Sequence, residues 1–219
     1  MLKAVIFDFD GVLFNSAKYY LKTRELFFKR YNIKFTKKEQ KENLATTTKD
    51  FLKYVNKKYN LSIKLSDYIS EKHDIFYSFI KEIKPNPGII NLLKTLKKKN
   101  IKIVLSSSNE RENILFLLNK YNILDYFDLI LTSEDIKRHK PYKDAFYNPL
   151  TFLKLSSNEC VGIEDSLQGI VSIHRAGLKS VGVLSEFTNV TDFKKLKTSL
   201  IVKSTKEITF NKLNSLIKL

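Results

Sequence analysis

Residues 3–11 read KAVIFDFDG, a short apolar run that ends in two aspartates and a glycine. Residues 3–7 have the pattern of a parallel strand buried on both faces, because they are short, apolar and end at a charged residue. Asp8 and Asp10 follow directly, and two acids beside a buried strand are costly unless they hold a cation or take part in chemistry. Gly11 permits the sharp turn that lets both carboxylates face one site. We therefore predict a strand with a functional site at its end, in preference to an ordinary turn.

After residue 88 the sequence alternates between strand and helix patterns. Apolar runs predict strands at 101–106, 128–132, 160–163, 179–184 and 200–203, and helical spacing predicts helices at 89–99, 110–121, 143–154, 166–176 and 206–218. Strands that alternate with helices form parallel sheets with right-handed crossovers. The predicted fold class is α/β, with a Rossmann-like parallel sheet as its core.

A segment of about 70 residues separates the first strand from this repeating part. Apolar residues recur there at helical spacing, as in YYLKTRELFFKRY (19–31) and YISEKHDIFYSFIKEI (68–83). We predict that residues 16–85 form an inserted all-helical cap domain, and that residues 1–15 and 86–219 form the α/β catalytic core. Ligands of open α/β sheets bind at the carboxyl ends of the strands, so an insertion after the first strand is expected to cover that site.

The net charge is strongly positive. The chain has 219 residues, with 39 Lys+Arg against 23 Asp+Glu, which gives a formal charge of +16. A basic domain is the electrostatic footprint of nucleic-acid binding. However, Lys outnumbers Arg 34 to 5 and no lysine run exceeds three residues, whereas phosphate-binding surfaces favour the bidentate fork of Arg. The composition therefore disfavours a nucleic-acid partner and assigns the lysines to solvated helix faces.

The sequence also bears on location and assembly. No apolar run approaches the roughly 18 residues that span a bilayer, and the first residues do not have the pattern of a signal peptide. The single cysteine, Cys160, cannot form an internal disulfide and is expected to be buried in a strand. We expect a cytoplasmic protein with no membrane association, active as a monomer or homodimer.

Three more polar stretches stand near the ends of predicted strands: SSN at 107–109, RHKP at 138–141 and GIEDS at 162–166. Hydroxyls and N–H groups at a helix start form an anion site, although Ser and Asn are also common helix caps. Lys140 can neutralise an anion, and we interpret His139 as a loop residue.

Four acids fit one metal. Asp8, Asp10, Glu164 and Asp165 offer the oxygen ligands that Mg²⁺ prefers, without the His and Cys that zinc favours. With a hydroxyl and Lys140 at neighbouring strand ends, such a set can bind a metal and a phosphoryl group. One carboxylate would attack phosphorus to give an aspartyl-phosphate, and the second aspartate would handle the proton.

The order DFDG, SSSN, HKP, GIEDS resembles that of the haloacid dehalogenase-like phosphohydrolase superfamily. With a helical insertion after the first motif, the chain is most similar to the phosphoglycolate phosphatase and β-phosphoglucomutase branch, and the resemblance covers essentially the whole chain. It implies a Mg²⁺-dependent phosphatase that hydrolyses a small phosphorylated metabolite through an aspartyl-phosphate.

The resemblance also implies a role for each polar residue of the four motifs. The catalytic residues are Asp8, Asp10 and Lys140; phosphate is bound by Ser107, Ser108 and Lys140; and the metal is bound by Asp8, Asp10, Glu164 and Asp165. Asp8 matches the nucleophile. Asp10 matches the general acid/base, which in the family also gives a backbone carbonyl to the metal.

Other members of the superfamily narrow the activity. Dehalogenases and phosphonatases lack the second aspartate, so Asp10 indicates phosphoryl transfer, and the ATPases carry Lys where Phe9 stands here. Asn15 departs from the acidic residue usual before Ser or Thr, a position near the cap hinge. The mutase branch carries a His near the position of Tyr20, so its absence favours a hydrolase. A β-phosphoglucomutase-like phosphomutase is the alternative.

Substrate specificity is expected to reside in the cap. Lys49, after three threonines, and Lys72, before His73, lie where related enzymes place groups that touch the non-reacting part of the substrate. We hypothesise that Lys49 or Lys72 binds a second anionic group, such as a carboxylate or a distal phosphate. The alternative is that both are solvated lysines of the cap surface.

Overall fold

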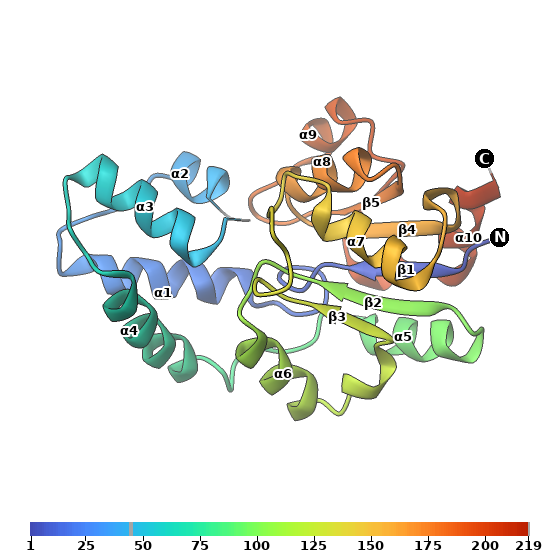
Figure 1. Cartoon of the computed structure of the whole chain (residues 1–219), viewed down its shortest axis with the longest axis horizontal. Coiled ribbons are helices and arrows are strands. Elements are labelled where there is room, and N and C mark those ends of the chain that lie inside the picture. Colours follow the sequence, from blue (N-terminus) through green and yellow to red (C-terminus); the bar gives the residue numbers. More distant parts are fainter. Residues whose placement is uncertain (44–45, 219) are drawn as a thin grey trace. The chain divides into compact units, whose positions relative to one another are not determined.

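A computed structural model describes residues 1–43 and 46–218. The chain folds as two compact units (Figure 1). The sheet unit consists of Met1–Phe14 and Pro85–Leu219, and the helical unit consists of Asn15–Lys84. The chain therefore leaves the sheet unit after its first strand and returns to it at Pro85.

The sheet unit is built on a six-stranded sheet with the strand order β3-β2-β1-β4-β5-β6. The strands are β1 (Ala4–Phe7), β2 (Lys102–Ser106), β3 (Leu129–Leu131), β4 (Cys160–Glu164), β5 (Lys179–Val183) and β6 (Leu200–Val202). All paired strands run parallel, and β1 lies between β2 and β4. The predicted α/β class with a Rossmann-like parallel sheet is confirmed.

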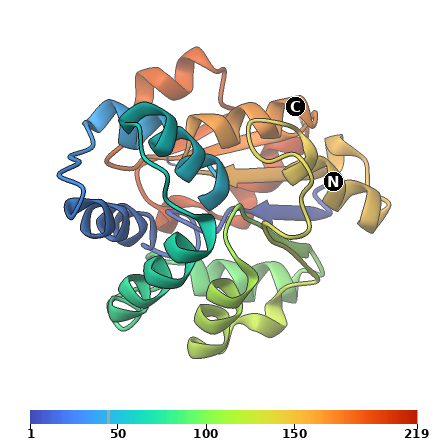
Figure 2. The ribbon, with the colours of Figure 1, turned by 60° about the vertical axis from the view of Figure 1, so that its left-hand side comes forward.

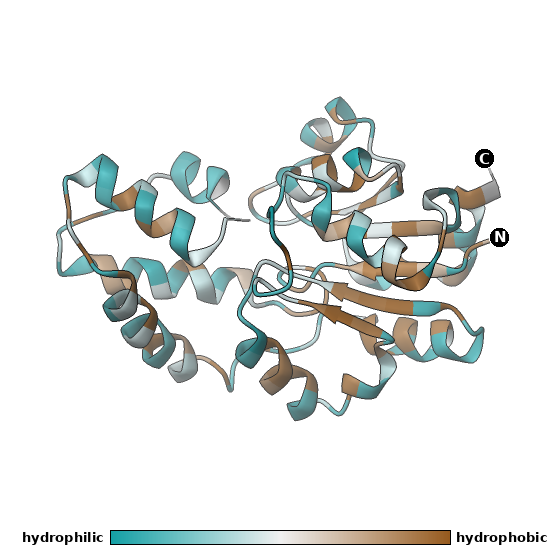
Figure 3. Ribbon diagram, in the orientation of Figure 1, coloured by the Kyte–Doolittle hydropathy of each residue, from teal (hydrophilic) through white to brown (hydrophobic). Residues whose placement is uncertain are grey.

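The central strands are buried on both faces, which explains their continuous apolar sequences. Every residue of β1 and of β4 is buried, including Cys160 at the start of β4. Ala4 and Ile6 of β1 belong to one hydrophobic cluster, while Val5 and Phe7 alternate to the opposite side. Figure 3 shows that β2 and β3 are largely hydrophobic. The predicted first strand is therefore a core element.

Helices cover both faces of the sheet (Figures 1 and 2). On one face lie α7 (Asp144–Leu153), α8 (Leu167–Arg175) and α9 (Val190–Lys195), and on the other lie α5 (Ile89–Lys98), α6 (Arg111–Lys120) and α10 (Phe210–Lys218). Phe146, Ile173 and Phe193 bring α7, α8 and α9 into the cluster of Ala4 and Ile6. None of the described helices has the length and apolar character that a bilayer crossing requires.

Some short elements differ from the sequence prediction. The six-residue helix α9 was not predicted, because so short a segment gives little periodicity. The predicted helix 206–218 begins only at Phe210, since Thr205–Glu207 forms a separate 3₁₀ turn. The Thr205 hydroxyl in that turn donates to the carbonyl of Pro87 at 2.7 Å, a contact across 118 residues. Further 3₁₀ turns lie at Leu124–Tyr126 and Ser157–Glu159.

The helical unit contains α1 (Ala17–Lys29), α2 (Lys37–Glu42), α3 (Thr48–Tyr59) and α4 (Leu65–Ser78). Its core is aromatic. Phe27 of α1 meets Tyr68 of α4 edge to face with ring centroids 4.7 Å apart, and Phe28 meets Phe51 of α3 at 5.9 Å. Such edge-to-face pairs add to the energy of apolar burial. The helical character predicted for this segment is confirmed.

Glu39 on α2 is a buried carboxylate that joins the N-cap of α2 to α3. Its Oε1 accepts hydrogen bonds from the Tyr59 hydroxyl at 2.6 Å, the Tyr54 hydroxyl at 3.1 Å and Lys58 Nζ at 3.0 Å. Its Oε2 accepts from the Thr36 N–H at 2.9 Å and the Thr36 hydroxyl at 2.7 Å. Burial by itself raises the pKa of Glu39, but these hydrogen bonds outweigh burial and hold the pKa well below its usual range.

We expect Glu39→Gln to lower the free energy of unfolding by about 2 kcal/mol at neutral pH, because a neutral amide replaces a charged acceptor. A carboxyl whose pKa is depressed by folding stabilises the protein above its unfolded pKa, and this contribution is lost as the pH falls below its ordinary value of 4.5. Wild type should therefore lose more stability on acidification than the variant.

Urea denaturation near pH 7 and near pH 3.5 measures both effects. Glu42→Gln is the matched control, since Glu42 lies on the same helix with its side chain 57% exposed. An acid-induced loss that is equal in wild type and Glu39→Gln would contradict the prediction.

Candidate active site

Residues from three of the four predicted motifs lie at the carboxyl ends of adjacent strands. β1 pairs with β2 on one side and with β4 on the other. Asp8 follows the last residue of β1, Ser107 follows the last residue of β2, and Glu164 is the last residue of β4. Because parallel strands end at the same edge, these side chains converge although they are far apart in sequence.

Lys140 connects two of the acids. It lies on the loop of residues 132–143, and its side chain is 2% exposed. Its Nζ donates to Glu164 Oε1 at 2.6 Å and to Asp8 Oδ1. Burial lowers the pKa of Lys140, but the charges of Asp8 and Glu164 outweigh it and raise the pKa, so the ammonium remains protonated. Lys140 is thus the positive centre of an acidic cluster.

The N-terminus of α8 fixes the side chain of Glu164, the last residue of β4. The N–H of Ser166 donates to Glu164 Oε2 at 2.7 Å, and the Ser166 hydroxyl caps the helix by accepting from the N–H of Gly169 at 3.0 Å. A Cβ on Gly169 would lie 1.9 Å from Glu164 Cδ. Only glycine therefore leaves room for this carboxylate against the first turn of α8.

Gly11 makes a similar space for Asp165. Its φ of +76° lies in the left-handed region, and a Cβ there would lie 2.0 Å from Asp165 Oδ2. Asn86 fixes the turn, because its side-chain amide donates to the carbonyls of Gly11 at 2.7 Å and Val12 at 3.0 Å. The turn that the sequence predicted at Gly11 thus admits a carboxylate from β4's end.

Three carboxylates form a set that suits a divalent cation. Asp8, Glu164 and Asp165 each present an oxygen within 4.8 Å of the others. Asp165 Oδ2 is buried with no hydrogen-bond partner among the described residues. Burial and then the charge of Glu164 raise the pKa of Asp165 well above its usual range, and burial also raises the pKa of Asp8. Mg²⁺ fits this set, since it prefers oxygen ligands and would offset the excess negative charge.

Asp10 has a different partner. Its Oδ2 accepts a hydrogen bond from Asn109 Nδ2 at 2.9 Å, across 99 residues of sequence. Residues 107–109 are predicted to bind an anion, and the bond from Asn109 to Asp10 was not predicted, because no local pattern links Asn109 to the first strand. The predicted metal contact of Asp10 stays a prediction.

The three consecutive serines at the end of β2, Ser106 to Ser108, have different hydrogen-bond partners. Ser106, still within the strand, donates its hydroxyl to the carbonyl of Ala145 at 2.6 Å. The Ser107 hydroxyl accepts from the N–H of Asn109 at 3.1 Å, and Ser108 Oγ is buried without a hydrogen-bond partner in the described part of the chain. Phosphate binding by Ser107 and Ser108 remains a prediction that these positions support.

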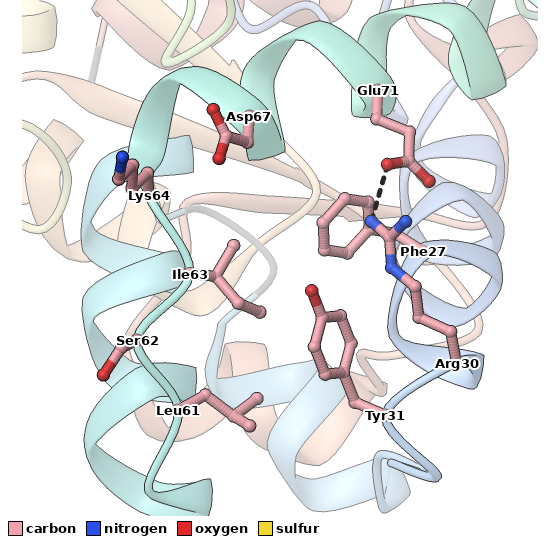
Figure 4. A pocket seen from close by; sticks show the side chains of 9 residues that line it. All are labelled: Phe27, Arg30, Tyr31, Leu61, Ser62, Ile63, Lys64, Asp67 and Glu71. Atoms are coloured by element: carbon pink, nitrogen blue, oxygen red, sulfur yellow. Dashed lines mark hydrogen bonds and ion pairs between the residues drawn. The ribbon is translucent and has the colours of Figure 1, made fainter.

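The two cap lysines belong to the helical unit. Lys72 on α4 is buried and donates to Thr48 Oγ1 at 2.7 Å, whereas Lys49 on α3 is exposed. A cavity of about 480 Å³ in this unit is lined by α1, α4 and residues 61–64, and neither lysine is among its lining residues. Figure 4 shows Arg30 and Glu71 paired at this cavity, at 2.6 Å. Binding of a second anionic group by Lys49 or Lys72 therefore stays a prediction.

Several known proteins are similar to this chain in sequence and fold. The family described as haloacid dehalogenase-like hydrolase matches residues 5–183. β-Phosphoglucomutase of Bacillus subtilis is 30% identical over 191 residues, 83% of each chain. A phosphorylated carbohydrates phosphatase of Thermotoga maritima is 24% identical over 184 residues, 82% of this chain and 84% of that protein. The crystal structure of β-phosphoglucomutase from Clostridium difficile has a TM-score of 0.86 and 31% identity, covering 100% of this chain and 98% of that one.

The orphaned oxygen of Asp165 leads to a prediction about metal binding. Without metal, Asp165→Asn should raise the free energy of unfolding by about 1–2 kcal/mol near pH 7.5, because it removes a buried carboxylate whose ionisation is unfavourable. The same variant should lose the stabilisation that wild type gains from Mg²⁺.

Thermal unfolding with EDTA and with about 10 mM MgCl₂ measures both changes. Asp125→Asn, at an exposed acid of a 3₁₀ turn, serves as the control and should match wild type. An Asp165→Asn protein that keeps the full Mg²⁺-dependent shift would rule out this carboxylate as a ligand.

Proposed function

The chain belongs to the haloacid dehalogenase-like hydrolase family, and on that premise we propose that it is a Mg²⁺-dependent phosphatase of a small phosphorylated metabolite, acting through an aspartyl-phosphate. One observation carries the proposal: the carboxylate of Asp8, at the end of β1, is buried against the ammonium of Lys140 beside the carboxylates of Glu164 and Asp165. A nucleophilic carboxylate in this position has a cation at hand and a metal-binding set next to it.

In the proposed first step, an oxygen of Asp8 attacks phosphorus while the bond from phosphorus to the ester oxygen breaks. Asp10 gives a proton to the departing oxygen, and the Asn109 amide on Asp10 Oδ2 orients that carboxyl group. The ammonium of Lys140 contacts the phosphoryl oxygens and offsets their charge. The alcohol leaves, and the phosphoryl group remains on Asp8.

In the second step, water attacks phosphorus and the bond to Asp8 breaks, which releases inorganic phosphate. Asp10 now takes a proton from that water. The hydroxyls of Ser107 and Ser108 hold phosphoryl oxygens in both steps. Asp8, Asp10, Glu164 and Asp165 would hold a divalent cation, which would act as a Lewis acid and offset the charge of the phosphoryl oxygens.

The names of relatives support a phosphorylated sugar as the substrate class, since one is a phosphorylated carbohydrates phosphatase and another a β-phosphoglucomutase. The formal charge of +16 also favours the approach of an anionic ester. A screen of several dozen phosphorylated metabolites with Mg²⁺, read by released phosphate, identifies the substrate.

A phosphomutase is the second candidate, favoured by the 30% identity to β-phosphoglucomutase of Bacillus subtilis. In that reaction a second hydroxyl of the sugar, instead of water, takes the phosphoryl group. Incubation with β-glucose 1-phosphate separates the two activities, because a mutase forms glucose 6-phosphate and a phosphatase releases free phosphate.

Substitution of the two aspartates tests the mechanism. Asp8→Asn should abolish turnover, because an amide is no nucleophile here. Asp10→Asn should lower kcat by about 10²–10⁴-fold, the usual contribution of general acid/base catalysis. Phosphate release measures both, with circular dichroism to verify folding and Asp125→Asn as control. Turnover retained by a folded Asp8→Asn protein would exclude the aspartyl-phosphate route.

The cap lysines supply a test of specificity. If Lys49 or Lys72 binds a second anionic group of the substrate, its replacement by Ala should raise KM for a doubly anionic substrate and change kcat little. Lys53→Ala, an exposed lysine of α3, is the control. A KM that stays at the wild-type value in both Lys49→Ala and Lys72→Ala would show that neither lysine binds the substrate.

A further inference from the structure

Lys140 must place one charge between two carboxylates, yet it stands on a loop. Residues 132–143 contain neither a helix nor a strand. Loops of this kind are mobile unless side chains tie them down, and a displacement of about 1 Å at a reacting centre can lower a rate by about 10². The contacts that fix the backbone around Lys140 therefore matter for its chemistry.

Residues 139–142 form a turn that carries Lys140 and is attached to α8. The N–H of Tyr142 donates to the carbonyl of His139 at 3.0 Å and closes the turn. Two side chains of α8 donate to the next two carbonyls after Lys140: Arg175 Nη1 reaches the carbonyl of Pro141 at 2.9 Å, and Ser172 Oγ reaches that of Tyr142 at 2.5 Å. Ser172 and Arg175 are three positions apart, so they share one face of the helix.

A second contact closes the base of the loop. The guanidinium of Arg138 forms a two-pronged ion pair with Asp144, with Nε 3.0 Å from Oδ2 and Nη2 2.9 Å from Oδ1. Fork-shaped pairs of this type fix geometry better than a single contact does. The turn is thus held at its base by Arg138 and along its backbone by α8.

The other end of α8 fixes one of the partners of Lys140. The Ser166 N–H, at the N-cap, binds Glu164, and Gly169 in the first turn leaves space for the Glu164 carboxylate. One helix therefore sets the position of the Glu164 carboxylate at its beginning and of the Lys140 turn at its end. A helix is stiff, so the two partners of this ion pair keep a constant separation.

We propose that Ser172 and Arg175 are positioning residues for Lys140, acting through the carbonyls of Pro141 and Tyr142. The effect on turnover rests on the proposed phosphatase function, whereas the effect on the position of Lys140 does not. Neither residue belongs to a motif that identified the site in the sequence.

Two measurements test the proposal. The first is the rate at which a lysine-acylating reagent labels Lys140 in the full-length protein, followed by mass spectrometry, because the Lys140 side chain is only 2% exposed. Labelling should rise several-fold in Arg175→Ala and further in Ser172→Ala/Arg175→Ala, while labelling of Lys102 stays constant. The second is turnover: kcat should fall roughly 10-fold in Arg175→Ala and about 10²-fold in the double variant, with a smaller change in KM. Arg175→Lys, which keeps one donor, should recover part of the loss.

Lys212→Ala is the matched control, since Lys212 also donates to a backbone carbonyl, that of Glu207 at 2.9 Å, from an exposed position of the same unit. It should leave both the labelling of Lys140 and kcat unchanged. In a Lys140→Ala background, Arg175→Ala should lower kcat no further, because its effect passes through Lys140.

The outcomes are distinct. Wild-type labelling of Lys140 in the double variant overturns the proposal, whatever happens to kcat. Increased labelling with an unchanged kcat also overturns it, and so does a full additional loss in the Lys140→Ala background. If the protein proves to have no phosphatase activity, the labelling measurement still decides whether α8 positions Lys140.

Discussion

The ammonium of Lys140, buried between the carboxylates of Asp8 and Glu164, imposes a strict demand on the sheet unit. Charges taken out of water are tolerated only where close partners and hydrogen bonds compensate for the lost hydration. The partners of Lys140 lie 132 and 24 residues away in the sequence. A parallel sheet with β1 next to β4 brings the two carboxylates to one edge, and the loop after β3 brings the lysine. The ion pairs of Lys140 therefore depend on a strand order that places β1 next to β4.

The charges of this cluster do not balance, since three carboxylates face one ammonium, and this imbalance connects the structure of the site to its chemistry. Among the described residues, Lys140 is the one cationic side chain that forms ion pairs with Asp8 and Glu164. Asp165 adds a third carboxylate to that site. Burial raises the pKa of Asp165, and its Oδ2 has no hydrogen-bond partner within residues 1–43 and 46–218. Structures seldom keep such a group for stability alone, and perturbed acids of this kind concentrate at functional sites. A divalent cation would correct the imbalance that the fold maintains.

Much of this arrangement follows from local sequence patterns, and the remainder depends on distant contacts. The strand at 3–7 and the acids after it were predictable, because the apolar run and the two aspartates that follow it lie together in residues 3–10. By contrast, the bond from Asn109 to Asp10 spans 99 residues, and the bond from Arg175 to Pro141 spans 34. Neither has a local signature. The hydrogen bonds of Glu39 were not predicted for the same reason, because its tyrosine partners lie 15 and 20 residues further along the chain.

The distinction between phosphatase and mutase cannot come from Asp8 and Lys140, because both reactions need the same phosphorylated carboxylate. It must come from groups that decide which hydroxyl is activated. Tyr20 stands near the position where the mutase branch, by resemblance, carries a histidine. Its ring stacks on Phe76 at 4.2 Å, with Lys72 Nζ 5.5 Å from its centroid. The resemblance assigns that histidine to acid/base chemistry in the mutase branch, so a phenol at this position favours the proposed hydrolase. In the proposed hydrolase, acid/base chemistry is assigned to Asp10, and water accepts the phosphoryl group.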